Sequence, residues 1–193
     1  MSQPSKILAF AGSTRTDSFN KKLVRIAAEG ARQAGASVTV LDLKDFPLPL
    51  FDQDLEAAEG QPEYARKLKE LFIQHQGLLI ASPEYNSSVT PVLKNAIDWV
   101  SRSLPGEPAL AAFQGKVASL VSASPGALGG LRGLVHLRSI LGNIGVIVLP
   151  QQIAVPKAHE AFAADGTLKD AKMQASVMAL GQALANTAGK LAD

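Results

Sequence analysis

The 193-residue sequence contains no cysteine. This absence excludes disulfide bonds, thiolate nucleophiles and cysteine-bound metals. An excess of charge of one sign is lacking as well, because 19 lysines and arginines stand against 17 aspartates and glutamates, for a net charge of +2. A strongly basic surface of the kind that binds nucleic acid is therefore not indicated, and we expect no nucleic-acid partner.

Long apolar segments are also missing. No run of the sequence approaches the roughly 20 apolar residues that span a bilayer. Residues 1–5 lack the basic region and long apolar stretch of a signal peptide. We therefore expect a cytoplasmic protein that does not contact membranes, and the length predicts one domain over residues 1–193.

Several signatures of enzyme classes are absent. The sequence has neither the Gly-x-x-x-x-Gly-Lys-Ser/Thr pattern of nucleotide triphosphatases nor the Gly-x-Gly-x-x-Gly of dinucleotide-binding folds. It has no Gly-x-Ser-x-Gly nucleophile elbow, which excludes an α/β hydrolase. His75, His136 and His159 are scattered without the spacing of metal ligands, so we expect no metal site.

The sequence does contain a regular alternation of two periodicities. Short apolar or β-branched runs predict five strands, and apolar residues repeating every three to four positions predict five helices between and after them. Five strands that alternate with helices predict a doubly wound α/β domain with a parallel sheet covered on both faces. The expected strands are residues 7–11, 37–41, 77–81, 116–121 and 144–149, and the helical stripes lie within 21–34, 64–72, 92–100, 131–141 and 173–184.

Further expectations concern individual segments. Residues 46–59, a proline-rich run followed by acidic residues, read as an extended and mobile connection. Thr90 and Pro91 suit an N-cap and a first helical turn. In the helix that follows, Asp98 is placed to pair with Arg102 four residues later, and Trp99 is expected to pack in the interior or at an interface. His136 and Arg138 are candidates for a subunit interface.

The most informative segment is residues 12–20, Gly-Ser-Thr-Arg-Thr-Asp-Ser-Phe-Asn, which lies where the first strand turns into the first helix. Backbone N–H groups and the positive end of the helix dipole converge at such a turn, so it is suited to a phosphate. Hydroxyl groups and one arginine, rather than glycines, would build the site. This composition favours a phosphomonoester over a pyrophosphate or triphosphate.

Two later strand exits carry the other distinctive loops. Residues 82–91 are restricted by two prolines, and residues 122–130 contain three glycines that permit close backbone approach to a flat ligand. Two doubly wound strand orders remain open from the pattern alone. In the order 2-1-3-4-5, the first loop and residues 82–90 would meet at the topological switch point, where ligands bind.

The motifs together carry a family resemblance. Gly12-Ser13-x-Arg15-x-x-Ser18-x-Asn20, Pro83-Glu84-Tyr85-Asn86 and Leu93-Lys94-Asn95-Ala96-Ile97-Asp98-Trp99 occur in this order, and with them the chain resembles the NADPH-dependent FMN reductase family. That family includes quinone, chromate and azo-dye reductases of flavodoxin-like fold. The resemblance implies a flavodoxin-like, doubly wound five-stranded parallel sheet of order 2-1-3-4-5 with helices on both faces, bound FMN, and NADPH or NADH as co-substrate.

The resemblance also implies roles for individual residues. It assigns the FMN phosphate to Ser13, Arg15, Ser18, Asn20 and the N–H of Phe19; the ribityl chain and ring to Pro83, Glu84, Tyr85 and Asn86; and the other ring edge to Ser124 and Gly126. Plainer roles stay open: the serines and Asn20 as helix caps, Arg15 and Glu84 as exposed charges, and Tyr85 as a contact to a neighbouring subunit. We name no catalytic residue, because the flavin itself would accept the hydride.

The resulting hypothesis is an FMN-dependent NAD(P)H oxidoreductase that works by a ping-pong mechanism. Quinones are the first candidates for its small-molecule acceptor, with chromate, azo compounds and free flavin as further candidates. The alternative is a non-catalytic electron carrier of flavodoxin type. The resemblance also implies a homodimer or homotetramer.

Overall fold

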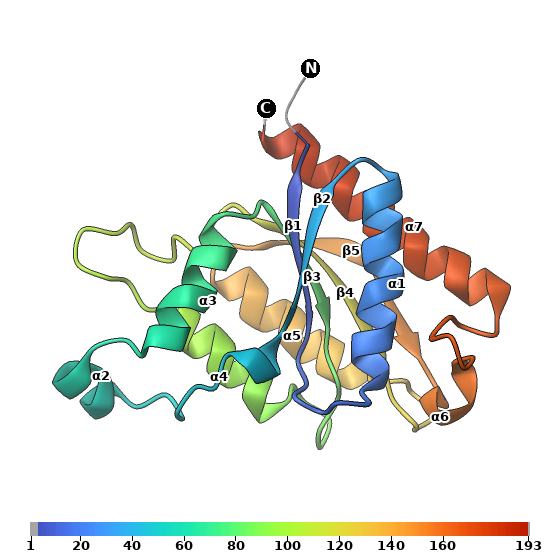
Figure 1. Cartoon of the computed structure of the whole chain (residues 1–193), viewed down its shortest axis with the longest axis horizontal. Helices are drawn as coiled ribbons and strands as arrows, with labels where there is room; N and C mark the ends of the chain where they lie inside the picture. The colour runs from blue at the N-terminus through green and yellow to red at the C-terminus, as the bar shows by residue number, and fades with distance from the viewer. Residues whose placement is uncertain (1–3, 193) are drawn as a thin grey trace.

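A computed structural model describes residues 4–192 of the chain. It contains one sheet of five parallel strands in the order β2-β1-β3-β4-β5, which confirms the flavodoxin-like topology. Figure 1 shows the sheet between two layers of helices. The strands are β1 (Lys6–Ala11), β2 (Ser37–Asp42), β3 (Gly77–Ala81), β4 (Val117–Ala123) and β5 (Ile147–Val155).

The helices cover both faces of the sheet, as expected. One face is covered by α1 (Phe19–Gln33) and α7 (Ala171–Ala192), and the other by α3 (Glu63–Ile73), α4 (Pro91–Val100) and α5 (Leu131–Asn143) (Figure 1). Three shorter elements lie in the connections: η1 (Leu43–Asp45), α2 (Gln53–Glu59) and α6 (Ala158–Ala161). Within residues 4–192, no helix is both long and apolar enough to pass through a bilayer.

Side chains of the central strands alternate between two hydrophobic cores. On β1, Ile7 and Ala9 point to the core under α1 and α7, whereas Leu8 and Phe10 point to the core under α3, α4 and α5. All four are fully buried. A strand that is buried on both faces needs apolar residues at successive positions, which is why these strands read as continuous apolar runs.

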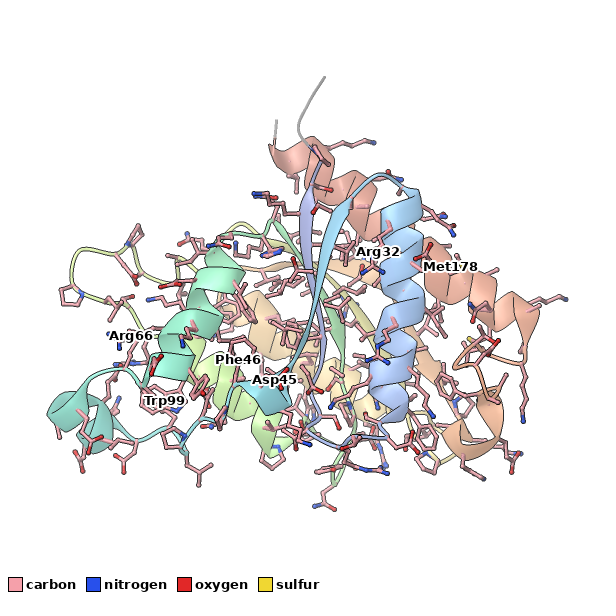
Figure 2. All side chains as sticks on the ribbon, in the orientation of Figure 1. Arg32, Asp45, Phe46, Arg66, Trp99 and Met178 are labelled. Carbon is pink, nitrogen blue, oxygen red and sulfur yellow. The ribbon has the colours of Figure 1, made fainter. Side chains whose placement is uncertain are left out.

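Helices α1 and α7 cross at very short range through two glycines. A Cβ atom on Gly30 would overlap the carbonyl oxygen of Met178, and one on Gly181 would overlap that of Ala27. Figure 2 shows Met178 at this crossing, beside α1. The absent side chains therefore allow the two backbones to touch.

The fifth strand begins later than predicted. Residues 144–146, expected as its start, instead close α5: Ile144 is the C-cap, and the N–H of Val146 donates to Leu141 O at 3.0 Å. Gly145 has a φ of 83°, the left-handed conformation that commonly ends a helix. Apolar residues at a helix end and in the next strand thus merged into one apparent run.

The connection over residues 46–59 is anchored rather than free, and its acidic part forms α2. The indole N–H of Trp99 donates to Pro49 O at 2.8 Å, and the amide of Asn95 both donates to Pro49 O and accepts from Phe51 N. Trp99 is fully buried, as the packing interpretation requires. The expected mobile segment is therefore held along α4.

The predicted ion pair between Asp98 and Arg102 does not form. Helix α4 ends at Val100, so Arg102 lies beyond the helical spacing that would bring it to Asp98. Asp98 instead accepts from Lys94, one turn earlier, at 2.8 Å. Arg102 Nε donates to both carboxylate oxygens of Glu56, at 3.0 and 2.9 Å, and so ties α2 to the end of α4.

Arg138, a candidate for a subunit interface, is engaged within the chain. Its guanidinium donates to the main-chain oxygens of Val148 at 3.2 Å and Leu149 at 2.8 Å, and to Oε1 of Gln152 at 3.1 Å. These acceptors lie where the pairing of β4 with β5 shifts register. The arginine thus satisfies carbonyl groups that the irregular edge strand leaves without a ladder partner.

Lys116 is a buried cation at the edge of the sheet where β4 begins. It is 8% exposed. Its ammonium donates to the main-chain oxygen of Ile73, the last residue of α3, and to that of His75, two residues later. Burial lowers the pKa of Lys116 from 10.5 to about 8. The folded protein therefore holds this proton less tightly than the unfolded chain does.

The lowered pKa predicts how stability depends on pH. Between about pH 8 and 10.5 the unfolded chain binds more protons at Lys116, so the free energy of unfolding should rise with pH relative to that of a Lys116→Met variant. Urea unfolding of both proteins at several pH values measures this difference. Lys172→Met, which removes a lysine that is already exposed to solvent, is the control. A difference between wild type and Lys116→Met that does not change with pH would contradict the prediction.

Candidate functional site

Three strand exits meet at the carboxyl edge of the sheet, the lower edge in Figure 1. The hydroxyl of Thr90 donates to Gly12 O at 2.6 Å, and that of Ser122 donates to Ser82 O at 2.7 Å. The loops after β1 and β3 enclose a cleft of about 230 Å³. The structure thus brings together the loops that the sequence singled out. The cleft is lined by Gly12, Ser13, Thr14, Arg15, Tyr85, Thr90, Pro91 and Val92.

The first loop leaves the N-terminus of α1 open. Ser18 is the N-cap residue, but its side chain makes no capping hydrogen bond, and the first turn contains no acidic residue. The hydroxyl of Ser13 accepts from the N–H of Arg15 at 3.3 Å, and the Arg15 side chain is exposed. A helix N-terminus without a cap or a carboxylate, next to an arginine, is a favourable place for an anion.

Two charged neighbours of this loop are already paired. Lys22 lies 2.9 Å from Asp17, and its hydrogen bond and charge lower the pKa of that carboxyl group. Lys21 lies 2.5 Å from Asp42 at the end of β2. Arg15, by contrast, has no carboxylate within ion-pair distance in residues 4–192. Its charge is therefore available to a ligand.

Asn20 is 3% exposed and ties α1 to β4. Its Nδ2 donates to Ala123 O at 2.8 Å, and its Oδ1 accepts from Ala123 N at 3.0 Å. One side chain thus satisfies both main-chain groups of a residue 103 positions away. The predicted phosphate contact of Asn20 stays a prediction, restricted to its main-chain N–H and the second hydrogen on Nδ2.

Phe19 is the first residue of α1, and its ring stacks on Phe162 with centroids 5.8 Å apart and planes 10° apart. The ring therefore packs between α1 and the segment after α6. Its main-chain N–H lies at the open N-terminus of α1. The family resemblance assigns this N–H to the FMN phosphate, and the assignment stays a prediction.

The second loop forms a tight two-residue turn. Tyr85 and Ser88 exchange two main-chain hydrogen bonds of 3.0 Å, and between them Asn86 and Ser87 have φ values of 50° and 66°. Residues other than glycine rarely adopt this left-handed conformation, and they do so mostly at functional sites and turns. Tyr85 is 52% exposed beside the cleft. Pro83 precedes the turn directly after β3 and Ser82.

The Glu84 side chain points to α5. Its carboxylate accepts from the N–H of Gly133 at 3.0 Å and from Arg132 Nη2 at 3.0 Å. Burial acts to raise the pKa of Glu84, but these two donors outweigh it and lower the pKa below its usual value. The carboxylate is thus ionised and occupied, which leaves the main chain of Glu84 for the predicted ring contact.

The third loop leaves open space where the sequence expected a flat ligand. The N–H of Gly126 donates to the hydroxyl of Ser124 at 3.3 Å, and a Cβ atom on Gly126 would meet nothing closer than 3.8 Å. Gly130, by contrast, has a φ of 93°, and a Cβ atom there would overlap the hydroxyl of Ser122. Within the described part of the chain, no group of histidines and carboxylates is arranged to hold a metal ion.

Comparison with known proteins identifies the family. A model of the family described as NADPH-dependent FMN reductase matches residues 5–160. The chain belongs to this family. An NAD(P)H-dependent FMN reductase of Pseudomonas aeruginosa is 36% identical over 185 residues, which are 95% of each protein. A quinone reductase of Escherichia coli is 36% identical over 152 residues, 77% of this chain and 76% of the relative.

A solved structure supports the same family. FerB, a flavoenzyme NAD(P)H:(acceptor) oxidoreductase from Paracoccus denitrificans, is 28% identical, with a TM-score of 0.80 over 96% of this chain and 98% of that one. The protein is thus an oxidoreductase that uses FMN and a reduced nicotinamide. The electron-carrier alternative is not favoured.

The donors of the cleft fit the phosphate end of FMN. The uncapped N-terminus of α1, which has no acidic residue in its first turn, and the exposed Arg15 supply donors and positive charge. The carboxylate of Asp17, which precedes the N-cap, is paired with Lys22. Three residues that shape this cleft could not be identified as such from the sequence. Thr90 was read only as an N-cap, although its hydroxyl also joins the two loops, and Arg132 and Gly133 carry no local signal for their contact with Glu84.

Proposed function

We propose that this chain keeps one FMN bound in the cleft and uses it to pass electrons from NAD(P)H to quinones. The observation that carries the proposal is the uncapped N-terminus of α1, which has no acidic residue in its first turn, together with Arg15, which lines the same cleft as Tyr85. The phosphate would be held by Ser13, Arg15, Ser18, Asn20 and the N–H of Phe19. The names of the quinone reductase relatives suggest the acceptor class; chromate, azo compounds and free flavin are further candidates.

The remaining site residues would hold the ribityl chain and the ring. One side of the flavin would be lined by Pro83, Tyr85, Asn86 and the main chain of Glu84. The other side would be lined by Ser124 and Gly126. Bound FMN would supply hydride acceptance, and the chain would supply orientation and hydrogen bonds. NADPH and NADH both stay candidates, because no residue that would distinguish a 2′-phosphate stands out. A nicotinamide and then a quinone would occupy the same open face in turn, as a ping-pong mechanism requires.

Exposed apolar residues in the cleft and around the start of α5 support an oligomer. Tyr85, Leu128, Leu131 and Val135 are 42–57% exposed. Leu131 and Val135 lie four positions apart in the first turns of α5, and Leu128 lies in the loop before it. We propose a homodimer or homotetramer formed by the single domain of residues 1–193, acting in the cytoplasm, where reduced nicotinamide is supplied. Light scattering coupled to gel filtration measures the oligomeric state.

The function is tested by stoichiometric reduction. We expect purified protein reconstituted with FMN to lose the flavin absorbance at about 450 nm when NADPH or NADH is added anaerobically. The absorbance should return when a benzoquinone is added. Steady-state rates at several quinone concentrations should give parallel double-reciprocal lines. Protein that binds FMN but is not reduced by either nicotinamide would favour the electron carrier.

A further inference from the structure

The loop after β3 is fastened to α5 by Glu84. The carboxylate accepts from Arg132 Nε at 3.2 Å and Nη2 at 3.0 Å through one oxygen, and from Gly133 N at 3.0 Å through the other. Gly133 is the third residue of α5, and the N-cap Gly130 has no side chain to offer. Glu84 therefore caps a helix that begins 47 positions later in the sequence, and its negative charge lies at the positive end of that helix.

A second contact fastens the same loop one turn further along α5. Ser88 Oγ and His136 Nδ1 lie 2.9 Å apart. Between the two contacts the backbones approach so closely that a Cβ atom on Gly133 would lie 3.1 Å from Ser88 O and 3.3 Å from the Cβ of Glu84. The loop is thus held at both ends of the turn that contains Asn86 and Ser87.

The turn between these contacts needs external support. Asn86 and Ser87 both have positive φ values, which cost free energy in residues other than glycine. Within residues 4–192, the main chain of the turn makes two hydrogen bonds, both between Tyr85 and Ser88, and Tyr85 is exposed. Strained backbone of this kind persists where surrounding contacts determine it, and the contacts available here come from α5.

The geometry points to Glu84 as a positioning residue, whose side chain latches the flavin-ring loop (residues 83–88) onto α5 and does not itself contact the ring. The inference deepens the proposed function and rests on it. In the latched state the loop is ready for FMN before FMN arrives. Without the latch only a fraction of molecules would hold the binding conformation, and the apparent affinity would fall by that fraction.

The latch has a consequence for electron transfer as well as for binding. Glu84 neutralises Arg132 next to the loop on which the ring would lie. Removing the carboxylate would leave the guanidinium and the positive end of α5 uncompensated. Positive charge near a flavin favours its reduced form, so the midpoint potential of bound FMN should become more positive. A carboxylate with a merely structural role would not move this potential.

The first test uses the apo-protein and does not depend on FMN. Hydrogen–deuterium exchange of residues 83–90 is compared in wild type, Glu84→Ala and Glu84→Gln. Glu84→Ala should exchange faster over these residues, and Glu84→Gln should be intermediate because its amide oxygen still accepts from Gly133. Glu56→Gln is a matched control that weakens another glutamate–arginine pair, Glu56–Arg102, in α2, and it should leave this segment unchanged.

The second test measures FMN. Glu84→Ala should raise the Kd for FMN about tenfold, measured by quenching of flavin fluorescence, and Glu84→Gln should raise it less. Both variants should shift the midpoint potential to more positive values, whereas Glu56→Gln should change neither quantity.

The outcomes separate the latch from the proposed function. Unchanged exchange over residues 83–90 in Glu84→Ala would overturn the latch whether or not the protein binds FMN. If Glu84→Ala exchanged faster but kept the wild-type affinity for FMN and the wild-type midpoint potential, Glu84 would only cap α5. This result would overturn its role as a positioning residue. If the wild type bound no FMN, the proposed function would fail, and the exchange result would still decide whether the latch exists.

Discussion

Replacing Arg15 with alanine is expected to raise the Kd for FMN by about ten- to a hundredfold. A hydrogen bond to a charged group contributes about 1.5–3 kcal/mol, and each 1.4 kcal/mol is about a tenfold change in Kd. The side chain is exposed and carries the positive charge at the open N-terminus of α1. The melting temperature of the apo-protein should stay close to that of wild type, because the guanidinium is not part of the core. Fluorescence titration and thermal unfolding measure the two effects.

Two further variants test whether charge or hydrogen-bond geometry matters at this position. Arg15→Lys keeps the charge but loses the planar, forked donor of the guanidinium, so it should recover only part of the affinity. Arg66→Ala removes an exposed arginine on α3 and should bind FMN like wild type. The effect of Arg15→Ala should also shrink at high salt. An unchanged Kd would remove Arg15 from the phosphate site.

The strands and helices could be predicted from the sequence because the pattern that specifies each of them lies within a short segment. The buried strands β1 and β3 are apolar at successive positions, and the stripe on α7 repeats at helical spacing. The order of the strands needed more than this pattern, since two orders were compatible with it. The family motifs decided between them, and the structure confirms their answer.

The partners of the site residues could not be predicted, because they lie far away in the sequence. Asn20 meets Ala123, 103 residues later, and Glu84 meets Gly133, 49 residues later. No spacing rule connects such positions; only the parallel sheet brings them to one edge. The loops were therefore identified correctly as neighbours, while the side-chain contacts between them were not foreseen.

The wrong expectations have a similar cause. The spacing of Asp98 and Arg102 predicts a pair only if the helix continues, and α4 ends at Val100. The acidic segment after residue 51 has no apolar stripe, and α2 accordingly buries none of its residues. Its attachment comes from Glu56 and Arg102, which are 46 positions apart. Local patterns thus failed where a helix ended or where a long-range contact held the segment.

Asn20→Ala is the second change expected to have a large effect, because the side chain acts on both the fold and the site. The substitution removes the side chain that pairs with both the N–H and the C=O of Ala123. Asn20 and Ala123 are each 3% exposed, so these two main-chain groups lie in the interior. Leaving a buried polar group unsatisfied costs about 1–3 kcal/mol. We therefore expect the free energy of unfolding to fall by about 2–4 kcal/mol, measured by urea denaturation. Asn143→Ala, at an exposed position at the end of α5, is the control.

Asn20→Asp separates the two roles. The carboxylate can still accept from Ala123 N, but it adds negative charge at the N-terminus of α1, where the phosphate of FMN is proposed to bind. A carboxylate there would interact favourably with the helix dipole and would repel the phosphate. Asn20→Asp should therefore bind FMN more weakly than Asn20→Ala, although it retains one more hydrogen bond to β4. Equal or tighter binding by Asn20→Asp would mean that the phosphate does not lie at this helix terminus.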